Sequence, residues 1–185
     1  MYRKILIANR GEIAVRLIRA CRALGIASVA VYQPVDANSL HVRLADESYR
    51  LDSHLGFNDA QALLDLAQRS GADAIHCGIG FLAENAEFAY ACQRQGIAFI
   101  GPPPEMINRL RHKIDCLETV RQAGFPVAPH FPAFFAGLDD ETCRAVRAAA
   151  DALGYPVLIK SFRGGRGRGE RLVSHPARLE KVLRR

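Results

Sequence analysis

The feature that most constrains the fold is a repeated order of helix, glycine and apolar run. Five times, a stretch with helical periodicity ends at a glycine and is followed by a short apolar segment. The five glycines are Gly25, Gly71, Gly96, Gly124 and Gly154. Glycine just past a helix end readily adopts the left-handed conformation that closes the last turn. The alternation predicts an α/β fold, a parallel sheet with helices on both faces.

The apolar runs and helical faces place the expected elements. Strands are expected at 4–8, 28–32, 73–76, 97–101 and 156–160, where short runs are rich in Ile, Val and Ala. Helices are expected at 12–24, 59–68, 86–94 and 141–153, where apolar residues recur every three to four positions. The first of these helices places Arg16 and Arg19 on its solvated side.

Three consecutive prolines, at 102–104, interrupt the alternation. Proline cannot continue a strand but readily starts a helix, and two helical pieces follow, EMINRLR and KIDCLETVRQA. We therefore expect one domain at 1–112 and a second at 113–185.

Composition argues against several classes of protein. No run of about 18 apolar residues is present, so no membrane-spanning helix is expected. The start, MYRKILIANRGE, lacks the long apolar region of a secretory signal, which favours a cytoplasmic protein. The five cysteines are scattered without a C-x-x-C pair, so we expect neither a metal site nor a disulfide framework.

The net charge of +6 is concentrated at one end of the chain, because residues 160–185 hold nine Lys or Arg and two Glu. This region contains SFRGGRGRGE, in which backbone N–H groups and guanidinium groups both suit phosphate oxygens. An RNA-binding tail of this kind would be repeated and unflanked, whereas here one copy lies between YPVLIK and ERLVSHPARLEKVL. We favour a two-stranded hairpin whose glycine tip covers phosphates, and rank nucleic-acid binding well below it.

Two other loops follow expected strands. ANRGEIAVR holds only Gly11 where a dinucleotide-binding protein would carry G-x-G-x-x-G, which argues against NAD. HCGIGFLAEN, at 76–85, is expected at the carboxyl edge of the sheet, where open α/β sheets bind ligands. There, Glu84 either meets a metal or another cation, or starts a helix whose dipole stabilises it. His76 is interpreted as a structural histidine.

Two lysines are candidate phosphate-binding groups. Lys160 ends an apolar strand, which would hold its ammonium group at the strand tip beside the glycine-rich loop. Lys113 starts the expected second domain, and a solvated surface position is the alternative for it.

These stretches, in this order, resemble the biotin carboxylase component of the acetyl-CoA, propionyl-CoA and pyruvate carboxylases. The resemblance is carried by KILIANRGEIAVRLIRACRALGI, HVRLADESYRL, GFLAENAEFA, FIGPPPEMI and GYPVLIK with the glycine-rich loop, so it covers essentially the whole chain. It implies a Rossmann-like pre-ATP-grasp domain followed by the beginning of an ATP-grasp domain. It also implies an ATP-dependent ligase that carboxylates carrier-bound biotin with bicarbonate.

The resemblance further implies site residues, cofactors and partners. Lys113 and Lys160 stand at the family's ATP-contacting lysines, and Arg16 and Arg19 match positions of the dimer contact in bacterial members. The phosphate-covering loop corresponds to Gly164, Gly165, Gly167 and Gly169. The implied cofactors are ATP and Mg²⁺, with biotin as the carried substrate. The implied partners are bicarbonate, the biotin carrier protein and either a homodimer partner or a completing chain.

The chain also departs from the family pattern. Arg163 and Arg166 replace expected glycines, and Glu170 replaces a usual methionine. The family's Mg²⁺ carboxylates, bicarbonate arginine and catalytic base correspond to positions beyond Arg185. The resemblance therefore implies an N-terminal portion of the enzyme that does not carboxylate biotin alone. The alternative is a non-catalytic interaction module that joins a carboxylase assembly.

Overall fold

The computed structural model describes residues 1–131, 135–137, 139–160 and 170–184. Contacts within the chain divide it into two compact units, Met1–Arg111 and His112–Arg185. Each unit has its own apolar clusters.

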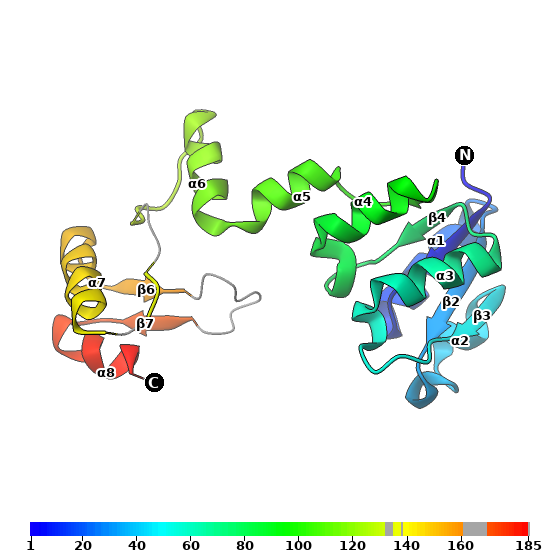
Figure 1. Ribbon diagram of the computed structural model, residues 1–185, viewed down its shortest axis with the longest axis horizontal. Coiled ribbons are helices and arrows are strands. Elements are labelled where there is room, and N and C mark those ends of the chain that lie inside the picture. The colour runs from blue at the N-terminus through cyan, green and yellow to red at the C-terminus, as the bar shows by residue number, and fades with distance from the viewer. Residues whose placement is uncertain (132–134, 138, 161–169, 185) are drawn as a thin grey trace. The chain divides into compact units, whose positions relative to one another are not determined.

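The first unit is built on a parallel sheet (Figure 1). Its five strands are β1 (Lys4–Ile7), β2 (Ala27–Tyr32), β3 (Glu47–Arg50), β4 (Ala74–His76) and β5 (Ala98–Phe99). Their order is β3-β2-β1-β4-β5, and every pairing is parallel. The chain thus builds outward on one side of β1 and then crosses to the other, as in Rossmann-like folds. The predicted parallel sheet is confirmed.

Helices cover both faces of this sheet, as predicted. On one face, α1 (Gly11–Ala23) packs against Ile5 and Ile7 of β1. On the other, α3 (Ala60–Ser70) and α4 (Ala86–Arg94) pack in the cluster that contains Leu6. Successive strand residues point to opposite faces, so the run KILI supplies both cores. The remaining elements are α2 (Leu40–Leu44), α5 (Pro104–Arg111), η1 (Pro34–Asp36), η2 (Gly56–Asn58) and η3 (Phe81–Glu84).

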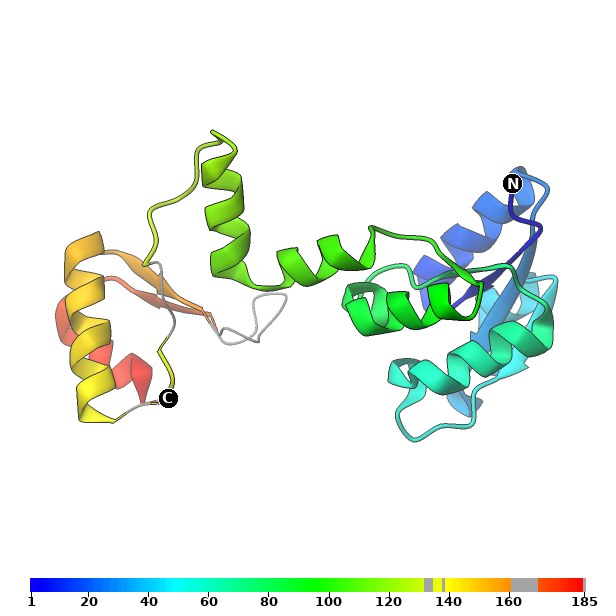
Figure 2. The same ribbon diagram turned by 45° about the horizontal axis from the view of Figure 1, so that its top comes forward.

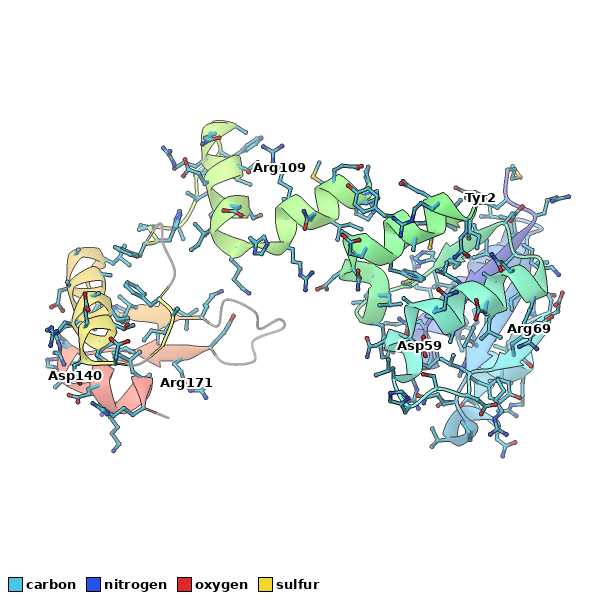
Figure 3. The ribbon with its side chains drawn as sticks, in the orientation of Figure 1. Tyr2, Asp59, Arg69, Arg109, Asp140 and Arg171 are labelled. Atoms are coloured by element: carbon cyan, nitrogen blue, oxygen red, sulfur yellow. The ribbon has the colours of Figure 1, made fainter. Side chains whose placement is uncertain are left out.

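Glycine ends the helices as the sequence predicts. All five predicted glycines have a positive φ, between 66° and 82°. This is the left-handed region that residues with a Cβ adopt at a cost. At the other end of α3, the carboxylate of Asp59, labelled in Figure 3, accepts the N–H of Ala62 at 3.0 Å and caps the helix.

The second unit contains an antiparallel hairpin on which two of its helices pack. The elements are α6 (Lys113–Gln122), α7 (Asp140–Leu153), β6 (Val157–Ile159), β7 (Arg171–Val173), η4 (Pro176–Arg178) and α8 (Leu179–Leu183). Figure 2 shows α7 and α8 beside the hairpin, and Ala150 and Leu179 pack with Val157 and Val173. The run at 156–160 therefore does not join the parallel sheet. Its partner is the strand after the glycine-rich segment, as the hairpin interpretation predicts.

No helix among the described residues is long and apolar enough to cross a lipid bilayer.

Candidate functional site

The hairpin of the second unit has two different faces. Val157 and Val173 lie opposite each other in register and point toward α7 and α8, with 8% and 0% of their surfaces exposed. Leu158 and Leu172 also lie opposite each other, and they are 48% and 64% exposed. Because neighbouring strand residues alternate between faces, the leucines lie on the face away from the helices. We call this face, with the residues that continue it, the outer face of the hairpin.

Lys160 and Glu170 continue the outer face. Lys160 directly follows Ile159, and Glu170 directly precedes Arg171. Ile159 and Arg171 lie opposite each other in register, and Arg171 is labelled in Figure 3. Lys160 Nζ lies 3.3 Å from Glu170 Oε1, and the two side chains are 47% and 34% exposed. The lysine that the sequence singles out therefore has an acidic partner on the neighbouring strand.

The other predicted nucleotide-binding residues have different placements. Lys113 is the first residue of α6 and is partly buried, with His112 as the residue before the helix. The loop glycines lie outside the described residues; they are Gly164, Gly165, Gly167 and Gly169. The grouping of both lysines with this loop stays a prediction.

Asn9 joins the loops that follow β1 and β4, at the carboxyl edge of the parallel sheet. Asn9 is 3% exposed, and its Nδ2 donates to the carbonyl oxygens of Cys77 at 2.7 Å and Ile79 at 3.1 Å. Its Oδ1 accepts the N–H of Arg10 at 2.8 Å. The order of the sheet reverses between β1 and β4, where Rossmann-like folds bind dinucleotides. In this unit the amide of Asn9 links the two loops at that point.

Gly78 lets the two loops approach closely. Its φ is +65°, and a Cβ there would lie 2.5 Å from Ile13 Cγ2 and 2.9 Å from Asn9 Nδ2. Side chains of the first loop and of α1 therefore pack directly against the backbone of the second loop. Sequence reasoning singles out the glycines of HCGIGFLAEN but not Asn9, which only the pairing of β1 with β4 brings to this place.

His76, the last residue of β4, makes a structural contact. Its Nδ1 accepts the N–H of Gly78 at 3.0 Å, so this nitrogen carries no proton. Burial, and then the positive charge of Arg16, lower the pKa of the His76 imidazole below its ordinary value. The neutral form is therefore favoured, which agrees with the structural interpretation.

Glu84 is exposed and is the last residue of η3. The helix that follows, α4, is capped by Asn85, whose Oδ1 accepts the N–H of Phe88 at 3.1 Å. Glu84 thus lies immediately outside the helix rather than in its first turn. Within the described part of the chain, no three His, Cys, Asp or Glu side chains are grouped so as to hold a metal ion.

Arg16 and Arg19 are exposed on the same side of α1. They border a hollow of about 560 Å³, which Val15 of α1 and Leu40 of α2 also line. Leu40 is 46% exposed, and arginine is among the residues enriched in protein interfaces. The predicted role of these arginines in a dimer stays a prediction.

A buried polar cluster near this hollow was not indicated by the sequence. Asp36 is 2% exposed and forms an ion pair with Arg10, while His41 is completely buried. Burial lowers the pKa of His41, which favours a neutral ring. Among the described residues, neither ring nitrogen of His41 has a hydrogen-bond partner.

Two family sequence models match the chain. The model described as "Biotin carboxylase, N-terminal domain" matches residues 1–107. The model described as "Carbamoyl-phosphate synthase L chain, ATP binding domain" matches residues 112–185.

Curated proteins with similar sequences include biotin carboxylases and carboxylase subunits. Biotin carboxylase 1 of Bacillus subtilis is 42% identical over 189 residues, which is 99% of this chain and 39% of the relative. The mitochondrial methylcrotonoyl-CoA carboxylase subunit alpha of Dictyostelium discoideum is 44% identical over 183 residues, 96% of this chain and 25% of the relative.

The solved structures that resemble this chain include biotin carboxylases. The biotin carboxylase domain of 2-oxoglutarate carboxylase from Hydrogenobacter thermophilus, a dimer with MgADP, ADP and bicarbonate, matches with a TM-score of 0.90 at 41% identity. The match covers 100% of this chain and 40% of that one. The biotin carboxylase of Campylobacter jejuni in complex with β-γ-ATP matches with a TM-score of 0.89 at 36% identity, over 98% of this chain and 40% of that one.

The parallel sheet, followed by an antiparallel hairpin with its helices, is thus the architecture of ATP-grasp proteins of the carboxylase type. Within that class, the chain belongs to the biotin carboxylase N-terminal domain family. The family resemblance predicted from the sequence is therefore confirmed. The chain spans 25% of the length of the Dictyostelium relative and 40% of the Hydrogenobacter domain.

Proposed function

We propose that this chain contributes to a biotin carboxylase, which uses ATP to carboxylate carrier-bound biotin with bicarbonate. The observation that carries the proposal is the match over the whole chain to a biotin carboxylase domain solved with MgADP and bicarbonate. In the proposed division of labour, residues 1–112 form the pre-ATP-grasp domain and residues 113–185 begin the ATP-grasp domain. The contact boundary after Arg111 and the two family matches, 1–107 and 112–185, support this division.

The outer face of the hairpin is the proposed nucleotide surface. Leu158 and Leu172 offer an exposed apolar strip on which a flat purine ring can pack. Lys160, on the same face, offers a positive charge to the phosphates, and the glycine segment at 164–169 follows it in the chain. The described residues therefore suit both the base and the phosphates of ATP.

Positive charge near the phosphates has a chemical purpose in the proposed reaction. ATP-driven activation of bicarbonate moves a phosphoryl group, and fixed cations stabilise the negative charge on its oxygens. We propose Lys160 and Lys113 for this role, with Gly164, Gly165, Gly167 and Gly169 closing over the phosphates. Mg²⁺ would neutralise part of the same charge when bound. We assign no Mg²⁺ ligand among the described residues. We propose the exposed Glu84 only as a contact for a cation.

Titration of the ¹⁵N-labelled 185-residue chain with MgATP tests the nucleotide surface. We expect chemical-shift changes at 157–160 and 170–173, because these residues form the outer face and its backbone. The amides of Asn9 and Cys77, where the β1 and β4 loops are already joined, should not move. Shifts confined to those amides, or saturating concentrations without any shift in the hairpin, would contradict the proposal.

Complementation tests the proposed activity. The chain is mixed with a polypeptide that supplies the remaining residues of the Bacillus subtilis relative, together with biotin, bicarbonate and MgATP. We expect bicarbonate-dependent ATP hydrolysis above that of either component alone. A folded, associated mixture without such hydrolysis would argue for the non-catalytic interaction module instead.

Partners and location belong to the same proposal. Arg16 and Arg19, beside the hollow of α1 and α2, are proposed as a homodimer contact. Light scattering on the chain and on a variant with Arg16→Glu and Arg19→Glu tests this, with loss of self-association expected in the variant. Cys21, Cys77 and Cys92 are buried free thiols, which suits a reducing compartment, and we propose the cytoplasm. Recovery of the native protein in another cell fraction would refute that location.

A further inference from the structure

The hairpin places an acidic side chain beside the lysine proposed to bind phosphate. We propose that Glu170 is an internal counter-ion of Lys160, which a nucleotide phosphate must displace in order to bind. Glu170 would then weaken nucleotide binding by this chain and make its affinity respond to salt. This inference rests on the proposed function of Lys160 and adds a residue that tunes it.

The register of the hairpin produces the pair. Ile159 of β6 lies opposite Arg171 of β7, so Lys160 and Glu170 occupy the next cross-strand position. Side chains at such positions are close enough to interact directly. The separation of 3.3 Å between Lys160 Nζ and Glu170 Oε1 is an ion-pair distance. Arg171 donates to the backbone carbonyl of Glu170 at 3.0 Å, which leaves the carboxylate directed to Lys160.

The exposure of the pair makes it displaceable. With 47% and 34% of the two side chains exposed, water screens the attraction. Ion pairs of this kind shift an equilibrium by roughly 1.4- to 5-fold. A lysine ammonium on its flexible stem can move from a carboxylate to a phosphate with little strain. The pair is therefore strong enough to compete with a ligand and too weak to prevent binding.

Two electrostatic effects act in the same direction. Binding a phosphate to Lys160 breaks the attraction between Lys160 and Glu170. It also brings negative charge close to a carboxylate that has lost its partner, which is a repulsion. Replacing Glu170 with a neutral residue removes both effects, so the substitution should tighten nucleotide binding.

Glu180 supplies a matched control. It lies on α8, which packs on the opposite face of the hairpin, and pairs with Arg184 at 3.2 Å. Glu170→Gln and Glu180→Gln make the same chemical change and remove the same charge from the same unit. An effect of net charge alone would appear equally in both variants.

The test is an NMR titration of the full chain with MgATP, in wild type, Glu170→Gln and Glu180→Gln, at low and high ionic strength. At low salt we expect the Kd of Glu170→Gln to fall by roughly 1.4- to 5-fold and that of Glu180→Gln to stay unchanged. At high salt the advantage of Glu170→Gln should shrink, because salt screens the pair.

The outcomes separate this inference from the proposed function. Should wild type bind MgATP on the hairpin while Glu170→Gln binds no better than Glu180→Gln, the counter-ion role is wrong and the nucleotide surface stands. Weaker binding by Glu170→Gln would also overturn the inference, because it would make Glu170 a ligand contact. If no variant shows hairpin shifts with MgATP, the proposed nucleotide surface fails and the inference falls with it.

Discussion

Gly78 and Gly25 have nearly the same backbone conformation but different surroundings. Their φ values are +65° and +69°; a Cβ on Gly78 would lie 2.5 Å from Ile13 Cγ2, whereas Gly25 has no atom within 4 Å of such a Cβ. We expect Gly25→Ala to destabilise the first unit by about 1–2 kcal/mol, the cost of a left-handed alanine. Gly78→Ala should cost about 1–3 kcal/mol more, because the loops must separate.

Native-state hydrogen exchange of the β1 amides measures both variants under the same conditions. Equal effects of the two substitutions would contradict the close packing of the two loops at Gly78.

His76 gives the first unit a dependence on pH. Burial lowers its folded-state pKa, so the unfolded chain takes up a proton at higher pH than the folded chain does. The stabilisation is therefore complete above the ordinary pKa of 6.5 and is lost as the pH falls through the folded-state pKa. We expect faster exchange of β4 amides at acidic pH and a smaller pH effect in His76→Gln. The exposed His175 provides a control, since His175→Gln should leave the β4 amides unchanged.

Single residues of the candidate site were predictable where local pattern decides their position. Lys160 ends an apolar run, and this pattern places it at a strand tip. The ion pair with Glu170 depends on the register of β6 with β7. Residues 161–169 separate these strands in the sequence, so their register does not follow from a local pattern. The exposure of Leu158 was not predictable either. VLI is apolar throughout, and only the packing of helices on one face of the hairpin determines which of its side chains are buried.

At the scale of elements, the side chain of Asp59 caps the N-terminus of α3. Its carboxylate accepts from Ser53 Oγ at 2.6 Å and from the N–H of Ala62 at 3.0 Å. These bonds, with the Ser53 bond first, lower the pKa of Asp59. Asp59→Ala should destabilise the helix start by about 1 kcal/mol, whereas Asp59→Asn should largely retain the cap.

The measurement is amide exchange in the first turn of α3. In wild type, the protection conferred by ionised Asp59 is present above the unfolded-state pKa and is lost as the pH falls through the lower folded-state pKa. Asp59→Asn should lack this acid dependence. Asp52→Ala, at an exposed ion pair, is the control and should leave α3 unchanged. Unaltered protection in Asp59→Ala would show that the cap is dispensable.

Elements with a strong local signal were predicted, and those without one were missed. The five helix-ending glycines have positive φ, and α4 occupies the predicted residues 86–94. In contrast, β3 reads ESYR and alternates partly buried with exposed residues at the edge of the sheet. A search for buried apolar runs does not detect such a strand. The short α2, Leu40–Leu44, was also missed, because five residues show too little periodicity.

At the scale of the whole molecule, each apolar cluster belongs to one unit. The clusters that contain Leu6, Ile7 and Ile107 lie within residues 1–111. The cluster that contains Leu179 lies within residues 112–185. Burial of these side chains is the main stabilising term for each unit, so a cavity should weaken the unit in which it is made.

Leu6→Ala and Leu179→Ala test this separation. The two leucines are 0% and 1% exposed, and such substitutions cost about 2–5 kcal/mol. We expect Leu6→Ala to accelerate exchange of β1 and β4 amides and to leave β6 and β7 unchanged. Leu179→Ala should do the reverse, and the double variant should show the sum, because independent sites that share no partners are additive. Leu24→Ala, at a side chain 66% exposed, controls for the loss of a leucine alone. Equal acceleration in both units after either substitution would mean that the chain unfolds as one cooperative body, and the division after Arg111 would then describe contacts but not stability.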